Sequence, residues 1–571
     1  MALTDRTATA DLTPLAPGPP SRPTQRRWLY PTIAIAALVL APVFGLLWFA
    51  IRGSGDLWPH LIEFVIPTAT RNTAVLLIGV GIAVTIIGVG TAWLVATFRF
   101  PGRRFFEWAL LLPLAVPTYI VAYAYLDVMH PTGPVQTFIR DIFGIASPRD
   151  FRLPDIRAMW GCIVLFSLVL FPYVYLPVRA LFVLQSASYV EAARMLGSGP
   201  RKAFFRIAVP LIRPALVIGL TLALLEALND VGAAQFLGVR TMTVSIYTVW
   251  STNHSVEGAA QIALAMLAVI LALLVWERSA RRRQRYVGGG HRTAPPPPVR
   301  LRGWRAIAAM VACALPILLG FAVPVSYLVH SALTRIGEFG WPPQLLSWIG
   351  NTVTLASIAT IIAVALGLFL AYAARILQGR AGRIALRLST IGYALPGTVL
   401  ALGVLTPIGS IDNAINRFMQ DTFGASVGLV LLGSGAAVIF AYILRFLPIA
   451  VGNAEAGLAK VSPSLDMAAR SLGAGPAEAA RRIHLPIIRP ALIAGALLVF
   501  VDCMKELPAT LMLRPLNFET LATQLYGEAV RGTYEVAAVS ALAIVLVGLL
   551  PVILLARTME RRPSMSSRTS A

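Results

Sequence analysis

Long uncharged apolar stretches recur from one end of this 571-residue chain to the other, and a water-soluble fold could not bury so many. Charged residues make up 13% of the chain, about half the share of an ordinary soluble domain. A helix crosses the roughly 30 Å hydrocarbon core of a bilayer with about 20 apolar residues. Stretches of this kind run over Trp28–Ile51, Asn72–Phe98, Trp108–Leu126, Ala158–Val178, Gly258–Trp276, Ala306–Thr334, Asn351–Ala374, Leu388–Ile411, Thr422–Leu444 and Val536–Ala556, and two more begin at Pro210 and Pro486. The pattern predicts an all-α polytopic membrane protein with about twelve transmembrane helices.

The second half of the chain repeats the first. Ile212-Arg213-Pro214-Ala215-Leu216 returns 276 positions later as Ile488-Arg489-Pro490-Ala491-Leu492, and Asn72-Thr73 returns 279 positions later as Asn351-Thr352. Apolar helices resemble one another by chance, but polar, Gly and Pro matches in one register do not. We therefore predict a tandem duplication of a six-helix unit, and because six spans is an even number the two repeats are parallel.

Basic residues are distributed unevenly over the two faces of this topology. If the N-terminus is cytoplasmic, most of the 48 Lys and Arg residues lie inside and most of the 26 Asp and Glu residues lie outside. The positive-inside rule then places both termini in the cytoplasm. The predicted division is a disordered cytoplasmic tail over 1–27, a first repeat over 28–278, an Arg- and Pro-rich cytoplasmic linker over 279–305, a second repeat over 306–557 and a cytoplasmic C-terminal tail over 558–571.

The strongest repeated motif lies in the predicted cytoplasmic loop between the fourth and fifth spans of each half. In the first copy, residues 187–196 and 201–208 read as two short helices separated by the turn Gly197-Ser198-Gly199-Pro200, with Pro210 at the start of the next span. A single copy could merely reverse the chain. Two copies favour a surface that two identical partners bind, because both copies have the same Ala-Ala-Arg, Gly-x-Gly-Pro and Arg-Pro-Ala-Leu pattern.

Glu191-Ala192-Ala193, followed by Gly197 and Pro210, resembles the EAA loop of permease subunits of binding-protein-dependent ABC importers. The resemblance implies the MetI-like permease fold in a bacterial inner membrane, a loop that docks on a cytoplasmic ATP-binding cassette ATPase in two copies, and a periplasmic substrate-binding protein. In the second copy Met467 stands in the Glu position. The resemblance implies that the ATPase-coupling residues are Glu191, Ala192, Ala193, Gly197, Pro210, Asp466, Ala468, Ala469, Gly473 and Pro486.

The length of the chain and the position of its linker resemble the fused two-copy permeases of the iron(III) branch of that family. The segments Glu226–Ala233 and Lys505–Leu511 carry the more specific part of the resemblance. Ferric iron is therefore the implied substrate. Relatives that take up thiamine, putrescine or sulfate share the EAA loop, so these substrates stay open.

The chain offers no ATP site of its own. A phosphate-binding loop needs Gly-Lys followed by Ser or Thr, whereas the three lysines, Lys202, Lys460 and Lys505, follow Arg, Ala and Met. We expect a transport subunit rather than an enzyme, with no cofactor, no stable metal site and no nucleic-acid partner, surrounded by membrane lipid. A twelve-helix secondary transporter is the alternative from another class.

Acidic residues recur four positions apart near the ends of the fifth and eleventh spans, as Glu226 with Asp230 and Asp502 with Glu506. Residues at this spacing share a helix face. One interpretation is that they cap helix ends or pair with Lys505 and nearby arginines. The other is that the two pairs face each other across the pseudo-two-fold axis and line the pathway, together with Asn229 and Lys505, where carboxylate oxygens would suit a hard cation. The outer loop over 127–157 could dock the binding protein or simply be solvated.

Overall fold

The computed structural model describes residues 22–145, 147–195, 206, 208–282, 299–377, 379–471, 473 and 476–560. Over this part the regular secondary structure is helical, apart from one short ladder of two strands. Eleven helices are long and apolar enough to cross a membrane, and a bent helix pair brings the number to twelve, as the sequence predicts.

The first repeat contains six membrane crossings and several short helices. Helix α1 of this repeat begins at Arg22, and the candidate span within it begins at Arg26, two residues before the expected start at Trp28. Its elements are α1 (Arg22–Arg52), α2 (Leu57–His60), η1 (Leu61–Val65), α3 (Ile66–Thr97), β1 (Phe98–Arg99), α4 (Arg103–Ala109), η2 (Leu112–Ala115), α5 (Thr118–Val128), α6 (Pro134–Phe143), α7 (Met159–Met195), α9 (Val209–Asn229), α10 (Gly232–Phe236), α11 (Met242–Ser251) and α12 (Val256–Arg282).

The second repeat follows the same order after the ladder strand β2 (Val299–Arg300). Its elements are α13 (Trp304–Ile317), η4 (Leu318–Ala322), α14 (Val323–Phe339), α15 (Leu345–Ile376), α16 (Arg380–Ser389), η5 (Ile391–Ala394), α17 (Gly397–Phe423), α18 (Ala436–Leu458), α19 (Pro463–Ser471), α20 (Pro476–Ala479), η6 (Ala480–His484), α21 (Leu485–Met504), α22 (Pro508–Leu513), α23 (Leu521–Arg531) and α24 (Tyr534–Glu560).

The third crossing of each repeat is broken by a proline. The helical stretches Arg103–Ala115 and Thr118–Val128 meet at 89°. Pro117 lies at the break with φ −55° and ψ 144°, and Pro396, its equivalent 279 positions later, has φ −58° and ψ 148°. Proline lacks the N–H that would continue the helix, and its extended backbone redirects the chain. The matching dihedral angles show that the sequence duplication is also a structural one.

The tenth span differs from the prediction over Thr422–Leu444. Helix α17 continues to Phe423, a loop covers 424–435, and the membrane helix α18 occupies Ala436–Leu458. The buried Asp412 carboxylate accepts hydrogen bonds from the backbone N–H groups of Val430, Leu431 and Leu432 at 3.1, 2.7 and 2.9 Å. Because these bonds satisfy the loop backbone, an apolar sequence can remain non-helical there.

The two repeats pack alike and interlock. A Cβ on Gly88 would lie 2.8 Å from Cβ of Val174, and one on the equivalent Gly367 would lie 2.8 Å from Cβ of Ala450, so α3 approaches α7 and α15 approaches α18 through a glycine. Helix α1 packs on α16 and α17 of the other repeat, and α14 packs on α5 and α24. Each repeat therefore contributes its first crossing partly to the other.

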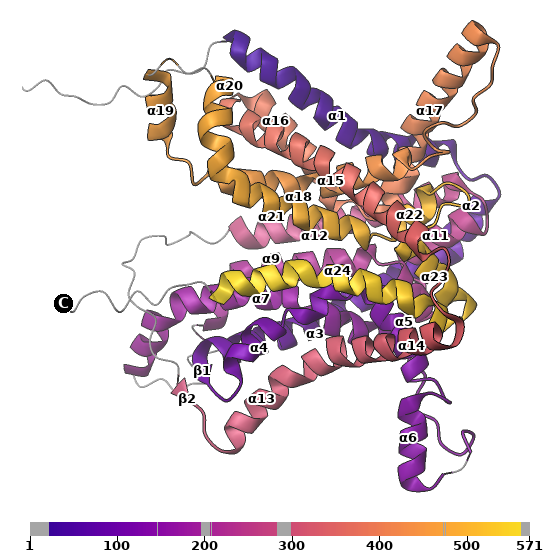
Figure 1. The fold of residues 1–571 in the computed structure, drawn as a ribbon, viewed down its shortest axis with the longest axis vertical. Helices are drawn as coiled ribbons and strands as arrows, with labels where there is room; N and C mark the ends of the chain where they lie inside the picture. The colour runs from indigo at the N-terminus through magenta and orange to yellow at the C-terminus, as the bar shows by residue number, and fades with distance from the viewer. Residues whose placement is uncertain are drawn as a thin grey trace, which may run out of the picture.

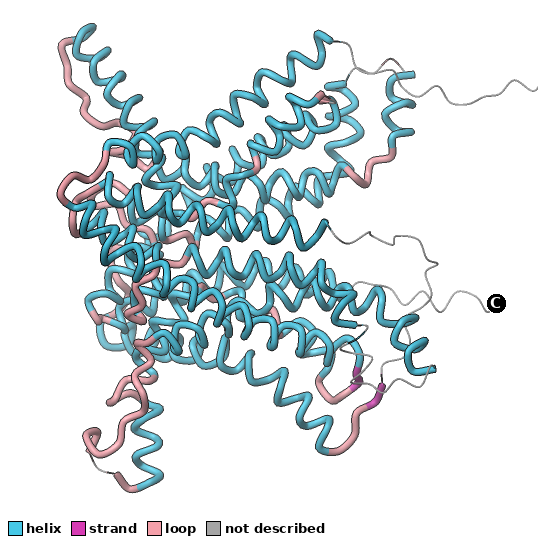
Figure 2. The backbone as a smooth tube through the Cα atoms, turned by 180° about the vertical axis from the view of Figure 1, so that it is seen from behind, coloured by secondary structure: helices cyan, strands magenta, loops and turns pink. Residues whose placement is uncertain are grey.

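The crossings lie side by side, and the two ends of the bundle differ (Figure 1). The start of α1, the ends of α12 and α24, the start of α13 and the short helices α19 and α20 all lie at one end, on the left of the view. Helices α6, α11, α22 and α23 lie at the opposite end. Figure 2 shows the β1–β2 ladder beside the start of α13. An even number of crossings per repeat accounts for this arrangement.

Candidate functional site: a charged cavity and two loop segments

The two copies of the loop motif between the fourth and fifth crossings differ in their helical structure. In the first repeat, residues 184–195 extend α7 without a break, so Glu191, Ala192 and Ala193 lie on a long continuous helix instead of the separate short helix expected over 187–196. Gly197 lies outside the described residues. Pro210 stands in the first turn of α9, as predicted.

In the second copy, the two helices α19 and α20 lie on either side of Gly473. Helix α19 carries Asp466, exposed Ala468 and buried Ala469, and Pro486 lies in the first turn of α21. Gly473 has φ +81°, and a Cβ built there would meet nothing within 4 Å. A side chain at this position would have enough space, but the left-handed backbone conformation would cost a residue other than glycine about 1–2 kcal/mol.

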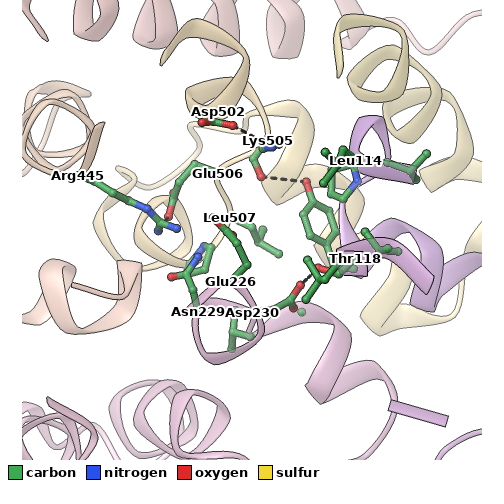
Figure 3. Close-up of a pocket in the computed structure, with 18 of the residues that line it drawn as sticks. Leu114, Thr118, Glu226, Asn229, Asp230, Arg445, Asp502, Lys505, Glu506 and Leu507 are labelled. Carbon is green, nitrogen blue, oxygen red and sulfur yellow. Dashed lines mark hydrogen bonds and ion pairs between the residues drawn. The ribbon is translucent and has the colours of Figure 1, made fainter. Parts of the chain in front are cut away.

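A cavity of about 90 Å³ lies between the repeats, near the ends of α9 and α21, and has room for a few water molecules. All six predicted pathway residues line it: Glu226, Asn229, Asp230, Asp502, Lys505 and Glu506. Figure 3 shows their side chains around one space, with Arg445 and Thr118. At 1.5 Å per residue, the end of α9 is about 30 Å from its start at Val209. The cavity is therefore remote from the loop motifs at the other end of α9 and α21.

Asp230 fixes the turn that follows α9. The side chain is 8% exposed, and Oδ1 accepts a 2.7 Å hydrogen bond from the backbone N–H of Ala233 in α10. The Thr118 hydroxyl at the start of α5 donates to Oδ2. Asp230, one residue before the N-cap Val231, thus accepts a hydrogen bond from the first turn of α10 and joins that helix to the broken third crossing.

Glu506 occupies the equivalent position after α21 and is even more constrained. One carboxylate oxygen accepts from the N–H of Ala509 at 2.9 Å, and the other accepts from the N–H of Thr510 at 3.0 Å and from its hydroxyl at 2.7 Å. Nη1 of Arg445, on α18, lies 2.9 Å from Oε1. The Arg445 and Glu506 side chains are 9% and 1% exposed, so this is a buried ion pair. The capping interpretation therefore describes the geometry of Asp230 and Glu506.

The other charged residues meet inside the cavity. Nζ of Lys505 lies 2.8 Å from Oδ1 of Asp502, and Glu226 attracts the same ammonium group from the opposite repeat. Oδ1 of Asn229 accepts a 2.7 Å hydrogen bond from the N–H of Gly397, and the Tyr119 hydroxyl donates to the Lys505 carbonyl at 3.3 Å. Both backbone bonds cross between the repeats. The cavity is thus part of their interface, with four carboxylates and two cations.

Arg445 and Gly397 are two site residues that the sequence reasoning missed. Arg445 lies well inside the apolar helix α18, and a cation within a span is itself a signal of an internal polar site. The misplaced tenth span ended at Leu444 and hid it. Gly397 is required because a Cβ there would lie 2.5 Å from Nη1 of Arg445 and 2.6 Å from Oε1 of Glu506.

The model of one protein family matches the chain twice, over residues 85–286 and 363–564. The family is described as "Binding-protein-dependent transport system inner membrane component". Each matched segment contains one loop motif and one acidic pair, so the family pattern and the internal duplication coincide. No enzyme family is indicated.

Relatives of two sizes match. The chain is 27% identical over 490 residues to the Fe(3+)-transport system permease protein FbpB 2 of Haemophilus influenzae, covering 85% of this chain and 88% of that protein. It is 29% identical over 201 residues to the molybdenum transport system permease protein ModB of Escherichia coli, covering 34% of this chain and 84% of that protein. It is 26% identical over 246 residues to the probable sulfate transport system permease protein cysT of Chlorokybus atmophyticus, covering 42% of this chain and 82% of that protein.

Proposed function

We propose that this chain, which belongs to the family of inner membrane components of binding-protein-dependent transport systems, is the permease subunit of an ATP-driven importer of ferric iron. The observation that carries the proposal is the cavity between the repeats, which is lined by four carboxylates contributed by both repeats. The similarity to an Fe(3+)-transport permease over 85% of the chain supports it.

The charges of the cavity favour a cation over an oxyanion. The relatives named for molybdenum and sulfate transport make an anionic substrate the second candidate, and Arg445 and Lys505 could serve it. Arg445, however, is engaged by Glu506 and Lys505 by Asp502. Because Glu226 and Asp230 also line the cavity, it has four carboxylates and two cations. Carboxylate oxygens suit a hard cation such as ferric iron.

The energy for transport would come from two copies of an ATP-binding cassette ATPase at the end of the bundle that carries α19 and α20, which we assign to the cytoplasm with both termini. Leu465 and Met467 on α19 are 39% and 42% exposed, and a groove on an ATPase would cover these apolar side chains. A periplasmic binding protein would dock at the opposite end, where the outer loop over 127–157 lies.

Movement of the loop motifs could reach the cavity along two helices. Pro210 begins α9, which ends beside Asp230, and Pro486 begins α21, which ends beside Lys505. Closure of the two ATPase subunits would draw the first turns of these helices together. The far ends carry the cavity residues, so the same movement would change the repeat interface there and alternate access between the two faces.

Uptake by the reconstituted complex tests the proposed substrate. The purified permease, its ATPase and its binding protein are placed in liposomes, and ATP-dependent accumulation of ferric iron is compared with that of thiamine, putrescine, sulfate and molybdate. We expect accumulation of ferric iron alone. Accumulation of an oxyanion would favour the second candidate, and uptake without any co-purifying ATPase would point to a secondary transporter.

Gly473 provides a test of the coupling segment. We expect Gly473→Glu to reduce ATP-dependent uptake at least several-fold, because a bulky residue strains the left-handed backbone that joins α19 to α20. Gly473→Asn is the matched control, since asparagine adopts this backbone more readily. Gly197→Glu in the first repeat should act in the same direction. Unchanged uptake together with unchanged ATPase co-purification would contradict the role of the turn.

A further inference from the structure

The β1–β2 ladder lies at the end of the bundle that carries α19 and α20 (Figure 1), and six arginines belong to the ladder strands and the residues that follow them. They come from two segments about 200 positions apart in sequence: Arg99, Arg103 and Arg104 around the start of α4, and Arg300, Arg302 and Arg305 around the start of α13. The parallel register places Arg99 directly beside Arg300. Like charges directly opposite each other on neighbouring strands are destabilising unless something neutralises them.

The protein supplies little negative charge to this arginine cluster. Among the described residues, none of the six forms an ion pair with a carboxylate. Glu107, the acidic residue nearest in sequence, is engaged by Arg179. The linker residues 283–298 contain no Asp or Glu. Nε of Arg103 donates to the Val95 carbonyl at 2.7 Å, which holds this guanidinium beside Arg99 and Arg104 and leaves its other N–H groups for a ligand.

The arginine cluster also lies at a membrane boundary. The crossing through α3 ends at Thr97, and the crossings through α4 and α13 begin at Arg103 and Trp304. Large apolar side chains stand exposed among the arginines: Phe105 is 50% exposed and Trp304 is 74% exposed. Aromatic residues beside basic ones are typical of the headgroup level of a bilayer, where the ring meets the acyl chains and the cation meets the phosphates.

We propose that the arginine cluster is a binding site for the phosphate headgroup of an anionic phospholipid. The headgroup would lie against Arg99 and Arg300, with Arg103, Arg104 and Arg302 around it, while its acyl chains pass Phe105 and Trp304. Guanidinium groups bind phosphate oxygens in pairs of parallel hydrogen bonds, which fits their abundance here and the absence of lysine from both segments. The bound lipid would join the two repeats at the ladder.

Native mass spectrometry of the full chain tests the site, with phosphatidylglycerol and phosphatidylcholine as probes. We expect the wild-type protein to retain phosphatidylglycerol through detergent exchange and to lose phosphatidylcholine. Arg99→Gln with Arg300→Gln should lower retained phosphatidylglycerol at least five-fold. The matched control is Arg149→Gln with Arg152→Gln, which removes the same charge from exposed positions on the outer loop and should leave retention unchanged.

Two further measurements separate the possible outcomes. Arg99→Lys with Arg300→Lys keeps the charge but not the paired hydrogen bonds, and it should retain more phosphatidylglycerol than the Gln variant and less than the wild type, which distinguishes lost binding from misfolding. Inorganic phosphate at high concentration distinguishes a lipid from a free anion. Equal retention in the Gln variant and the wild type would overturn the proposal, and so would complete displacement of phosphatidylglycerol by inorganic phosphate.

Discussion

Replacing Arg445 with Met is expected to lower the free energy of unfolding by about 3–5 kcal/mol, because it leaves the Glu506 carboxylate charged, buried and without its cation. Glu506 cannot turn to water, since its oxygens are held by the N–H groups of Ala509 and Thr510. The measurement is thermal or denaturant unfolding of the purified chain in detergent, followed by helical circular dichroism.

Arg514→Gln is the matched control for this substitution. Arg514 pairs with Glu519 at 2.8 Å, but the two side chains are 28% and 34% exposed, so water screens the charges. Loss of such a pair costs about 1 kcal/mol or less. Arg445→Met combined with Glu506→Gln should recover much of the loss, because the remaining side chain is neutral. A single Arg445→Met variant no less stable than Arg514→Gln would show that the buried pair does not hold the site together.

The duplication and the number of crossings could be predicted from the sequence because they depend on many residues at once. One substituted position does not hide a run of about 20 apolar residues, and the offset of 276 positions is supported by several Pro, Gly and Arg matches. Pro117 and Pro396 are one such match, and each of them lies at the break in the third crossing of its repeat.

The predicted bounds of the tenth span were wrong because apolar composition is not sufficient for a helix. The sequence around Leu429–Leu432 reads like part of a membrane span, yet its N–H groups are bound by Asp412, which lies 18–20 positions earlier. A pattern search over neighbouring residues cannot detect that partner. The same error hid Arg445, whose contact with Glu506 spans 61 positions.

The acidic pairs could be found from the sequence, but which of their carboxylates bind backbone N–H groups could not. Spacing of four residues predicted that Glu226 and Asp230 share a face, and both line the cavity. Whether a carboxylate caps a helix depends on the turn that follows it. Asp230 and Glu506 stand in the short breaks before α10 and α22, while Glu226 and Asp502 stand one helical turn earlier. Asp230 and Glu506 are therefore constrained by backbone N–H groups, whereas Asp502 pairs with the Lys505 side chain.

The inner carboxylates are the ones whose removal should abolish transport without unfolding the protein. We expect Glu226→Gln with Asp502→Asn to lower ferric iron uptake at least ten-fold in the reconstituted complex, because an interaction with a charged group contributes about 1.5–3 kcal/mol and the double variant removes two. Asp502 pairs with Lys505 and Glu226 lines the same cavity, where both carboxylates could bind a passing cation in place of that ammonium group. Assembly with the ATPase should stay normal.

The outer carboxylates provide the contrast, since Asp230→Asn with Glu506→Gln changes the same number of charges in the same cavity. These residues accept hydrogen bonds from backbone N–H groups at the starts of α10 and α22, so their replacement should lower the unfolding temperature and the yield of folded complex. If the inner pair destabilised the fold as much as the outer pair, or if folded complex with the inner substitutions took up ferric iron at the wild-type rate, Glu226 and Asp502 would be structural residues and the pathway would have to lie elsewhere.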